Sequence, residues 1–458
     1  MNAIGLRGVE VDGAVVDVRI SAGVVVDVAP SIRFGKDDEV VEGAGGALLP
    51  GLHDHHVHLL ALAAARRSVR LGPPEVVDER GVAAALAAAD HALPAGAWIR
   101  AVGYHDSVAG PLDRRRLDEL VPRRPVRIQH RSGALWILNT AALRAIGRDA
   151  FGDGRLHGAD RELRDRLPAD DPPDLAPVGR ELSAYGVTGV TDATPFSSAE
   201  DLDLLAGARA RGELPQHVQV TGGPALAGAD VPPGLDRGPV KVLLSDHDLP
   251  PLDDLAAWMT VAHGHGRPVA VHCVTRVALV LALAAWDEAG ARRGDRVEHG
   301  AVVDAQVARH VAALGLTVVT QPGFVAERGD RYLAEVDAAD RPHLWPCRSL
   351  LDAGVAVAFS TDAPFGNPDS WHAVAAAVTR RTAEGRTLGG SEAVDARTAL
   401  SRLLGELGDP GGAPRQVRCG MAADLCLLDE PLDSALAHPS SEHVVLTLQG
   451  GAVVHRRR

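Results

Sequence analysis

The sequence predicts an α/β protein built on a (β/α)8 TIM-like barrel, with a small β-sandwich domain formed by both chain ends and an α/β insertion after the first barrel strand. Three observations predict this fold. The chain has 458 residues, a length that suits a large barrel with a satellite domain. Its middle alternates buried strand patterns with helix patterns, as βα units do. Its two ends instead contain short strand patterns separated by turn signals.

Short antiparallel strands are expected at both ends of the chain. Apolar and polar residues alternate across residues 9–29, with turns expected at Asp12-Gly13 and Ala22-Gly23. Near the C-terminus, strands are expected at 424–428 and 444–448, and the second turns back at a Gln-Gly-Gly sequence. We therefore expect the two ends to form one small β domain.

Eight apolar runs in the middle of the chain have the length of buried strands. Helix patterns separate them, for example at 252–263, 276–288 and 304–314. The expected strands are 47–52, 187–193, 218–221, 240–244, 269–272, 297–299, 316–321 and 355–361. Eight such strands with crossover helices predict a closed barrel.

The gap between the first two expected strands is too long for a barrel connection. It contains strand-like runs of its own, at 98–103 and 126–130, which indicates an inserted α/β subdomain. The expected boundaries are 1–46 with 415–458 for the small β domain, and 47–414 for the barrel, with the insertion at 64–182.

The composition predicts a protein that binds neither nucleic acid nor a membrane. Lys and Arg total 47 and Asp and Glu total 60, so the net charge is −13, and no basic block is present. No stretch is apolar for long enough to span a bilayer, and we expect no signal peptide. The four cysteines form no CxxC pair, which argues against a zinc knuckle or a disulfide framework. We expect a cytoplasmic protein that acts on a small molecule, and a homo-oligomer is left open.

Two histidines close to the end of the first expected strand are candidate metal ligands. Successive side chains of a strand point to opposite faces, so His56 and His58 lie on the same side and can chelate one ion. A polar loop that happens to contain several histidines is an equally good explanation of this pattern taken alone.

Residues on other expected strands favour the metal site. Lys241 interrupts an apolar strand, whereas His272, His299 and Asp362 each end one. An ion pair for the lysine, and caps or satisfied core histidines for the others, are the alternatives. Metal-binding residue types nevertheless recur on strands one, four, five, six and eight. In barrel enzymes the carboxyl ends of the strands carry the active site.

This array resembles the amidohydrolase superfamily, and within it the YtcJ-like group (amidohydrolase family 3). The match rests on the HxH motif of His56 and His58, followed by Lys241, His272, His299 and Asp362 in family order. Further similar stretches lie at 98–104, 138–143 and 420–425. The resemblance covers nearly the whole chain, and the set of six residues is its most specific part.

The resemblance implies a binuclear metal centre. His56, His58 and Asp362 would bind the more buried ion, and His272 and His299 the more exposed one. Lys241, carboxylated on its side-chain nitrogen, would bridge the two; carboxylation would also remove the buried positive charge. One or two divalent ions are expected, with zinc the first choice and manganese, iron, cobalt or nickel compatible with these ligands.

The expected reaction is hydrolysis of a non-peptide C–N bond, such as that of an amide or formamide, by metal-activated water. Asp362 would act as general base toward the water and then as general acid toward the leaving nitrogen. Asp54, Asp192 and Asp246 are further acidic candidates near strand ends, expected to cap or support rather than to bind metal.

Substrate-facing positions are less sharply indicated. His130 follows a strand of the insertion, but the nearby Ser132-Gly133-Ala134 lacks the Asp-Gly-His that the YtcJ-like group often carries there. The segment 321–324, Tyr332 and Trp371 are candidates to line the pocket, with ordinary packing as the alternative.

Two other functions remain compatible with the fold that the sequence predicts, a deaminase and an inactive scaffold. A deaminase of the same superfamily often has a glutamate three residues after the fifth-strand histidine, whereas Thr275 stands there in this chain. A catalytically inactive scaffold relative would usually have lost ligands, whereas every expected ligand is present. Both comparisons favour the hydrolase.

Overall fold

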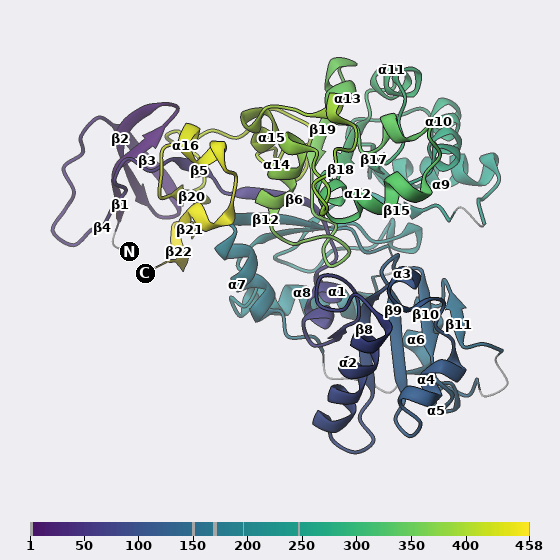
Figure 1. Cartoon of the computed structure of the whole chain (residues 1–458). Helices are drawn as coiled ribbons and strands as arrows, with labels where there is room; N and C mark the ends of the chain where they lie inside the picture. Colours follow the sequence, from purple (N-terminus) through teal and green to yellow (C-terminus); the bar gives the residue numbers. More distant parts are fainter. Residues whose placement is uncertain (1–2, 149–151, 168–171, 196, 246–247, 458) are drawn as a thin grey trace. The chain divides into compact units, whose positions relative to one another are not determined.

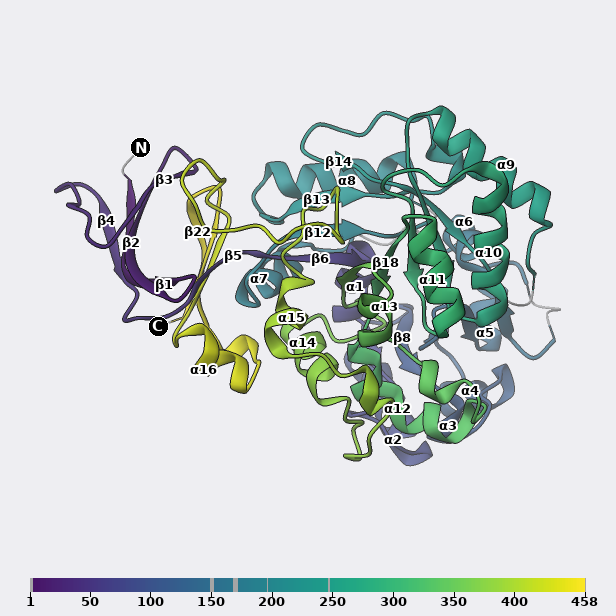
Figure 2. The ribbon, with the colours of Figure 1, turned by 90° about the horizontal axis from the view of Figure 1, so that it is seen from above.

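The computed structural model describes residues 3–148, 152–167, 172–195, 197–245 and 248–457 (Figures 1 and 2). The chain forms two compact units, each described by itself. The first unit combines residues 1–59 with 175–458, and the second contains residues 60–174.

Parallel strands form the centre of the first unit, in two sheets. The four-stranded sheet has the order β14 (Asp236–Arg237), β13 (His217–Val220), β12 (Val187–Asp192) and β6 (Leu52–Val57). The five-stranded sheet has the order β15 (Val240–Leu243), β16 (Val269–Cys273), β17 (Arg296–His299), β18 (Thr317–Thr320) and β19 (Ala356–Phe359). Most of these strands are buried on both faces, which explains their continuous apolar runs.

Main-chain hydrogen bonds connect the two parallel sheets at both edges. Lys241 N donates to Gly222 O over 2.8 Å, which joins β15 to the segment after β13. Asp362 N donates to His56 O over 2.8 Å, which joins the segment after β19 to β6. The carboxyl ends of the first and last of these strands therefore lie next to each other.

Helices follow the parallel strands, and several begin at residues that cap them well. Ser198 forms a capping box with Asp201 at the start of α8, and Thr275 and Asp304 cap α10 and α11. Figure 2 shows α9, α10 and α11 side by side. The helices of this unit are α7 (Ala176–Ala184), α8 (Ala199–Ala210), α9 (Leu252–Gly264), α10 (Arg276–Ala289), α11 (Ala305–Ala313), α12 (Gly323–Glu335), α13 (Arg348–Asp352), α14 (Ser370–Thr379), α15 (Ala396–Ser401) and α16 (Leu432–Ala437).

The prediction that residues 47–52 form the first barrel strand is wrong. Residues of this run form β5 (Leu48–Pro50), which pairs with β20 (Leu425–Leu428), and the parallel strand β6 begins only at Leu52. The chain changes sheet at Gly51, where a Cβ would lie 2.2 Å from the side chain of Thr188. An apolar run does not reveal such a break, because both strands are buried.

Two four-stranded sheets contain the strands of the chain ends. One has the order β3 (Val24–Ala29), β2 (Ala14–Ser21), β1 (Ile4–Val11) and β4 (Glu39–Glu42); the other has the order β22 (Ala452–Arg456), β21 (Val444–Gln449), β20 and β5. Leu6 and Val18 of the first and Leu425 and Leu446 of the second belong to one hydrophobic cluster. Asp12 and Ala22 adopt positive φ in the turns that the sequence predicts.

The second unit has its own five-stranded sheet and core. The sheet order is β11 (Arg155–His157), β10 (Leu135–Leu138), β9 (Val126–His130), β8 (Ile99–Tyr104) and β7 (Val69–Arg70). Its helices include α2 (Glu79–Ala92), α3 (Asp106–Ala109), α4 (Arg114–Leu120), α5 (Thr140–Ala145) and α6 (Asp160–Arg166), and α1 (Leu59–Arg66) leads into it from the first unit. Within the described parts of the chain, no helix is long and apolar enough to cross a bilayer.

Candidate metal centre

His56, His58 and Asp362 come together at the carboxyl ends of β6 and β19. One ligand atom from each lies within 4.8 Å of the other two. Asp362 Oδ1 lies 3.2 Å from His58 Nε2 and 3.5 Å from His56 Nε2, but it accepts no hydrogen bond of good geometry from the described residues. Asp362 itself has a φ of 56°, a conformation that aspartate adopts at low frequency. The geometry thus leaves a buried carboxylate oxygen available to a cation.

His272 and His299 extend this group through their rings. The ring centroids of His272 and His299 are 4.4 Å apart, and those of His56 and His299 are 4.9 Å apart. His272 is the next-to-last residue of β16, and His299 is the last residue of β17. Neither belongs to the tight three-residue group, so these five candidate ligands form a contiguous cluster around a smaller set of three.

Lys241 lies in β15 with 2% of its surface exposed. Its Nζ makes no hydrogen bond with the part of the chain that is described, so the ion pair considered from the sequence is not formed. Burial lowers the pKa of the Lys241 ammonium to about 8. Burying a charged amine that has no partner costs free energy, so this amine is a suitable site for a modification that removes the charge.

Burial disfavours the charged form of three imidazoles of the cluster. Burial lowers the pKa of His56 to about 3, and it lowers the pKa of His272 and of His299 as well. Burial alone would raise the pKa of Asp362, but the close contact with His58 and the nearby rings of His56 and His299 hold it well below the usual range. Neutral imidazoles and an ionised carboxylate are the forms that bind metal.

Side chains behind the cluster orient three of its imidazoles. Gln321 Oε1 lies 2.8 Å from His299 Nδ1, while its Nε2 donates to Ser360 Oγ and to the Val319 carbonyl. Because a carbonyl only accepts, this fixes the amide so that Nδ1 of His299 carries the proton and Nε2 is left as a ligand. Gln321, a candidate to line the pocket, therefore supports His299 instead.

Glu298 is a functional candidate that the sequence reasoning missed. Its Oε2 contacts His56 Nδ1, and its Oε1 accepts from Arg296 Nε over 2.6 Å. The third oriented imidazole, His58, has Thr194 Oγ1 3.2 Å from its Nδ1. One signal was available: Arg296 and Glu298 are two charges on the same side of a buried strand, which requires that they find partners.

The further acidic candidates act as caps where the structure describes them. Asp54 accepts the Thr361 hydroxyl over 2.5 Å and the main-chain N–H of Thr361 over 3.1 Å, which ties β6 to the segment that follows β19. Asp192 accepts from Leu59 N over 2.8 Å and from Thr194 N over 3.0 Å. Asp246 lies outside the described residues.

Most of the aromatic candidates pack against their neighbours. Trp371 is fully buried and donates its indole N–H to the Tyr185 carbonyl, which is ordinary packing. Tyr332 packs in a cluster with Trp345, whose ring centroid lies 6.5 Å from that of His299. His130 belongs to the second unit, where its Nδ1 contacts Ser132 Oγ.

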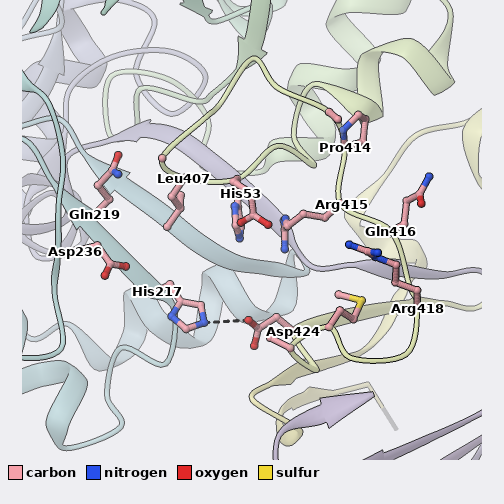
Figure 3. A pocket seen from close by; sticks show the side chains of 15 residues that line it. His53, His217, Gln219, Asp236, Leu407, Pro414, Arg415, Gln416, Arg418 and Asp424 are labelled. Carbon is pink, nitrogen blue, oxygen red and sulfur yellow. Dashed lines mark hydrogen bonds and ion pairs between the residues drawn. The ribbon is translucent and has the colours of Figure 1, made fainter. Parts of the chain in front are cut away.

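A pocket of about 1000 Å³ lies at the other ends of the strands and contains none of the candidate ligands (Figure 3). It is lined by residues near the beginnings of β6 and β13, among them His53 and His217, and by the charged residues Arg415 and Asp424. Because the amino ends of strands in such folds contribute stability rather than chemistry, we assign it no part in the reaction.

The residues of the cluster fit a divalent cation. Asp362 Oδ1 and Lys241 Nζ are buried polar atoms that have no hydrogen-bond partner among the described residues, in a protein interior where such atoms are normally paired. The donors are imidazole nitrogens and a carboxylate oxygen, which suit zinc and several other divalent ions.

Comparisons with known proteins identify the family of this chain. The model of the amidohydrolase family matches residues 39–455. The chain therefore belongs to the amidohydrolase family and is a hydrolase that acts on carbon–nitrogen bonds, which confirms the resemblance inferred from the sequence.

Named relatives are similar over most of the chain. The N-substituted formamide deformylase of Arthrobacter pascens is 25% identical, over 92% of this chain and 90% of that protein. The putative amidohydrolase YtcJ of Bacillus subtilis (strain 168) is 22% identical, over 76% of this chain and 77% of that protein. The crystal structure of an uncharacterized metal-dependent hydrolase from Pyrococcus horikoshii OT3 has the same fold, with a TM-score of 0.74 and 19% identity over 96% of this chain and all of that one.

Proposed function

We propose that this protein hydrolyses an N-substituted formamide or a closely related small amide. The observation that carries the proposal is the convergence of His56, His58 and Asp362, whose ligand atoms lie within 4.8 Å of one another at adjacent strand ends. The similarity to a formamide deformylase over 92% of the chain supports this choice among C–N bonds.

We also propose that the two parallel sheets are parts of one closed barrel. The main-chain bonds at both edges, from Lys241 to Gly222 and from Asp362 to His56, support closure. In this arrangement the candidate ligands would all lie at the carboxyl ends of the strands, the face that carries active sites in barrel enzymes. Residues 1–46 and 415–458 would form a β-sandwich beside it, with 64–182 inserted.

One ion would be held by His56, His58 and Asp362, and a second by His272 and His299. Lys241 would bridge them as a carboxylate after reaction of its neutral amine with carbon dioxide. A bound divalent ion supplies a Lewis acid, which polarises the substrate carbonyl and makes water nucleophilic near neutral pH. Zinc is the ion we expect first.

Asp362 would move the proton. As the water oxygen forms a bond to the carbonyl carbon, Asp362 accepts a proton from it; when the C–N bond breaks, the same carboxyl group donates that proton to the leaving nitrogen. The products are a carboxylic acid, formic acid for a formamide, and an amine; the acid then ionises and releases the second proton of the water. The lowered pKa of Asp362 keeps its carboxylate ionised at neutral pH, the form that can accept a proton.

The deaminase alternative receives no support from position 275. The Thr275 hydroxyl accepts from Ala278 N over 3.2 Å and caps α10, so it is used by the helix. A hydroxyl also lacks the acidity of the glutamate that such deaminases use to transfer protons.

The test combines elemental analysis with hydrolysis of a panel of N-formyl and N-acetyl amines. We expect His56→Ala to lose metal and activity, and Asp362→Asn to lose turnover even where metal is retained. His263→Gln serves as a control, because His263 is buried against Asp295 and outside the cluster. Full activity of Asp362→Asn, or of the wild type after exhaustive chelation, would refute the mechanism.

The carboxylated lysine has a separate test. Protein equilibrated with ¹³C-bicarbonate and Zn²⁺ should show one carbamate resonance that is absent from Lys241→Gln. A spectrum without that resonance in the metal-loaded wild type would show that the lysine is not the bridge, while leaving the three-residue site in place.

A further inference from the structure

We propose that Glu298 is a positioning residue, which orients the imidazole of His56 and makes it a stronger metal ligand. Arg296 in turn holds Glu298 in place. The inference rests on the proposed role of His56 as a ligand. Glu298 and Arg296 lie two residues apart on β17, and 0% and 1% of their surfaces are exposed. Glu298 reaches from β17 to His56 on β6 with one oxygen, and binds Arg296 with the other.

The contact fixes the tautomer of His56. A carboxylate oxygen can only accept, so Nδ1 of His56 must carry the proton that it donates to Glu298. The lone pair of His56 is then on Nε2, the atom that lies 3.5 Å from Asp362 Oδ1. A carboxylate behind a ligating imidazole both orients the ring and makes it a stronger donor.

Glu298 is held as an anion. Its Oε1 accepts from the Arg296 guanidinium over 2.6 Å, and because a guanidinium keeps its charge, the ionised carboxylate is the form that pairs with it. This negative charge is the feature that separates His56 from the other oriented imidazoles. His299 is supported by the neutral amide of Gln321, and His58 by the hydroxyl of Thr194.

The backbone of β17 explains how neighbouring residues serve the same cluster. In an extended strand, Glu298 and His299 would point to opposite faces. His299 instead has a φ of 73° and Gly300 a φ of 56°, so the extended conformation ends at His299. Non-glycine residues adopt positive φ rarely, and such conformations concentrate at functional sites.

A purely structural ion pair is the competing explanation, and the chain offers a matched control for it. His263 Nε2 and Asp295 Oδ2 are 3.0 Å apart and almost fully buried, and Trp286 also donates to this carboxylate. This pair has the same chemistry as His56 and Glu298 but none of its residues is a candidate ligand.

The experiment compares Glu298→Gln with Asp295→Asn. Each variant is loaded with Zn²⁺ and titrated with a competing chelator, and its unfolding midpoint is measured without metal. We expect Glu298→Gln to bind Zn²⁺ between about 10 and 100 times more weakly than the wild type. Asp295→Asn should lower the unfolding midpoint and leave the Zn²⁺ affinity unchanged. The double variant Arg296→Met with Glu298→Gln removes both buried charges, and supplies a folded protein if the single variant is unstable.

The outcomes separate this inference from the proposed function. Wild-type Zn²⁺ affinity in folded Glu298→Gln, or an equal loss of affinity in Asp295→Asn, would overturn the positioning role. Stoichiometric Zn²⁺ that His56→Ala also retains at full affinity would overturn the proposed metal site itself. Weaker binding confined to the Glu298 variants supports the inference.

Discussion

Replacing Asp424 by asparagine tests how the C-terminal strands are held to the parallel sheet. Asp424 immediately precedes β20 and has 5% of its surface exposed. Its Oδ1 accepts from Gln449 Nε2 over 3.0 Å and from Gly450 N over 2.6 Å, in the turn between β21 and β22. Its Oδ2 lies 3.0 Å from Nε2 of His217 on β13, as Figure 3 shows. Asparagine has nearly the same shape, so the substitution removes mainly the charge.

The expected loss follows from these contacts. A hydrogen bond to a charged group contributes about 1.5–3 kcal/mol and a neutral one about 0.5–1.5 kcal/mol, so each of the two bonds in the turn weakens by about 1 kcal/mol. The His217 side chain is 44% exposed, so its ion pair adds at most about 1 kcal/mol. We therefore expect Asp424→Asn to destabilise this part of the protein by about 2 kcal/mol at pH 7.

The loss should depend on pH with a definite sign. Burial would raise the pKa of Asp424, but His217, the Gly450 N–H and Arg415 lower it below the usual range. A carboxyl group with a depressed pKa stabilises the folded state above its unfolded pKa of about 3.9, and this contribution disappears as the pH falls through the folded pKa. The difference between wild type and Asp424→Asn should shrink as the pH falls below about 4.

Hydrogen exchange of the β20, β21 and β22 amides measures this local stability, with urea unfolding as a second readout. Exchange in β7, β8 and β9 of the second unit provides the internal control, because that unit has a sheet and a core of its own. Equal protection in the two proteins at pH 7, or a difference that grows toward pH 3.5, would refute the reasoning.

Three other outcomes are expected. Gln321→Leu removes the acceptor behind His299 and should release part of the bound metal at chelator concentrations about 10 times lower than for the wild type, as elemental analysis would show. Arg380→Met leaves three buried main-chain carbonyls without their donor and should destabilise the protein by about 3 kcal/mol or more in urea. Cys419 should be the one thiol that reacts with Ellman's reagent in the native protein, because the other three are buried and burial raises the pKa of Cys347 to about 11; four should react in denaturant.

The sequence predicted the parallel strands well, because burial on both faces gives each of them a continuous apolar run. Seven of the eight expected strands overlap one parallel strand each, whereas 47–52 overlaps β5 and only the first residue of β6. The error arose at Gly51, where the chain leaves one buried sheet and enters another without any change in polarity. The division between sheets is set by pairing partners, which a run of apolar residues does not encode.

The three residues of the tight group could be predicted because each occupies a strand end that local sequence reveals. Alternation along a strand places His56 and His58 on one side, and Asp362 stands three residues after Phe359, the end of the apolar run that forms β19. The roles of Lys241, His272 and His299 depend on which strands are neighbours, and they stay predictions. The contiguity of His272 and His299 with the tight group nevertheless agrees with the order of strands that the sequence suggested.

Glu298 could not be assigned because its role is created by packing between strands far apart in the chain. It is separated from His56 by 242 residues, and its neighbour His299 drew attention as the candidate ligand. Strict alternation would have placed only one of these two residues inside. The positive φ of His299 ends the strand and removes that restriction, so a single segment supplies both an imidazole to the cluster and the anion behind another imidazole. Ligands placed by local periodicity are therefore predictable, whereas the groups that orient them depend on tertiary contacts and on a local departure from that same periodicity.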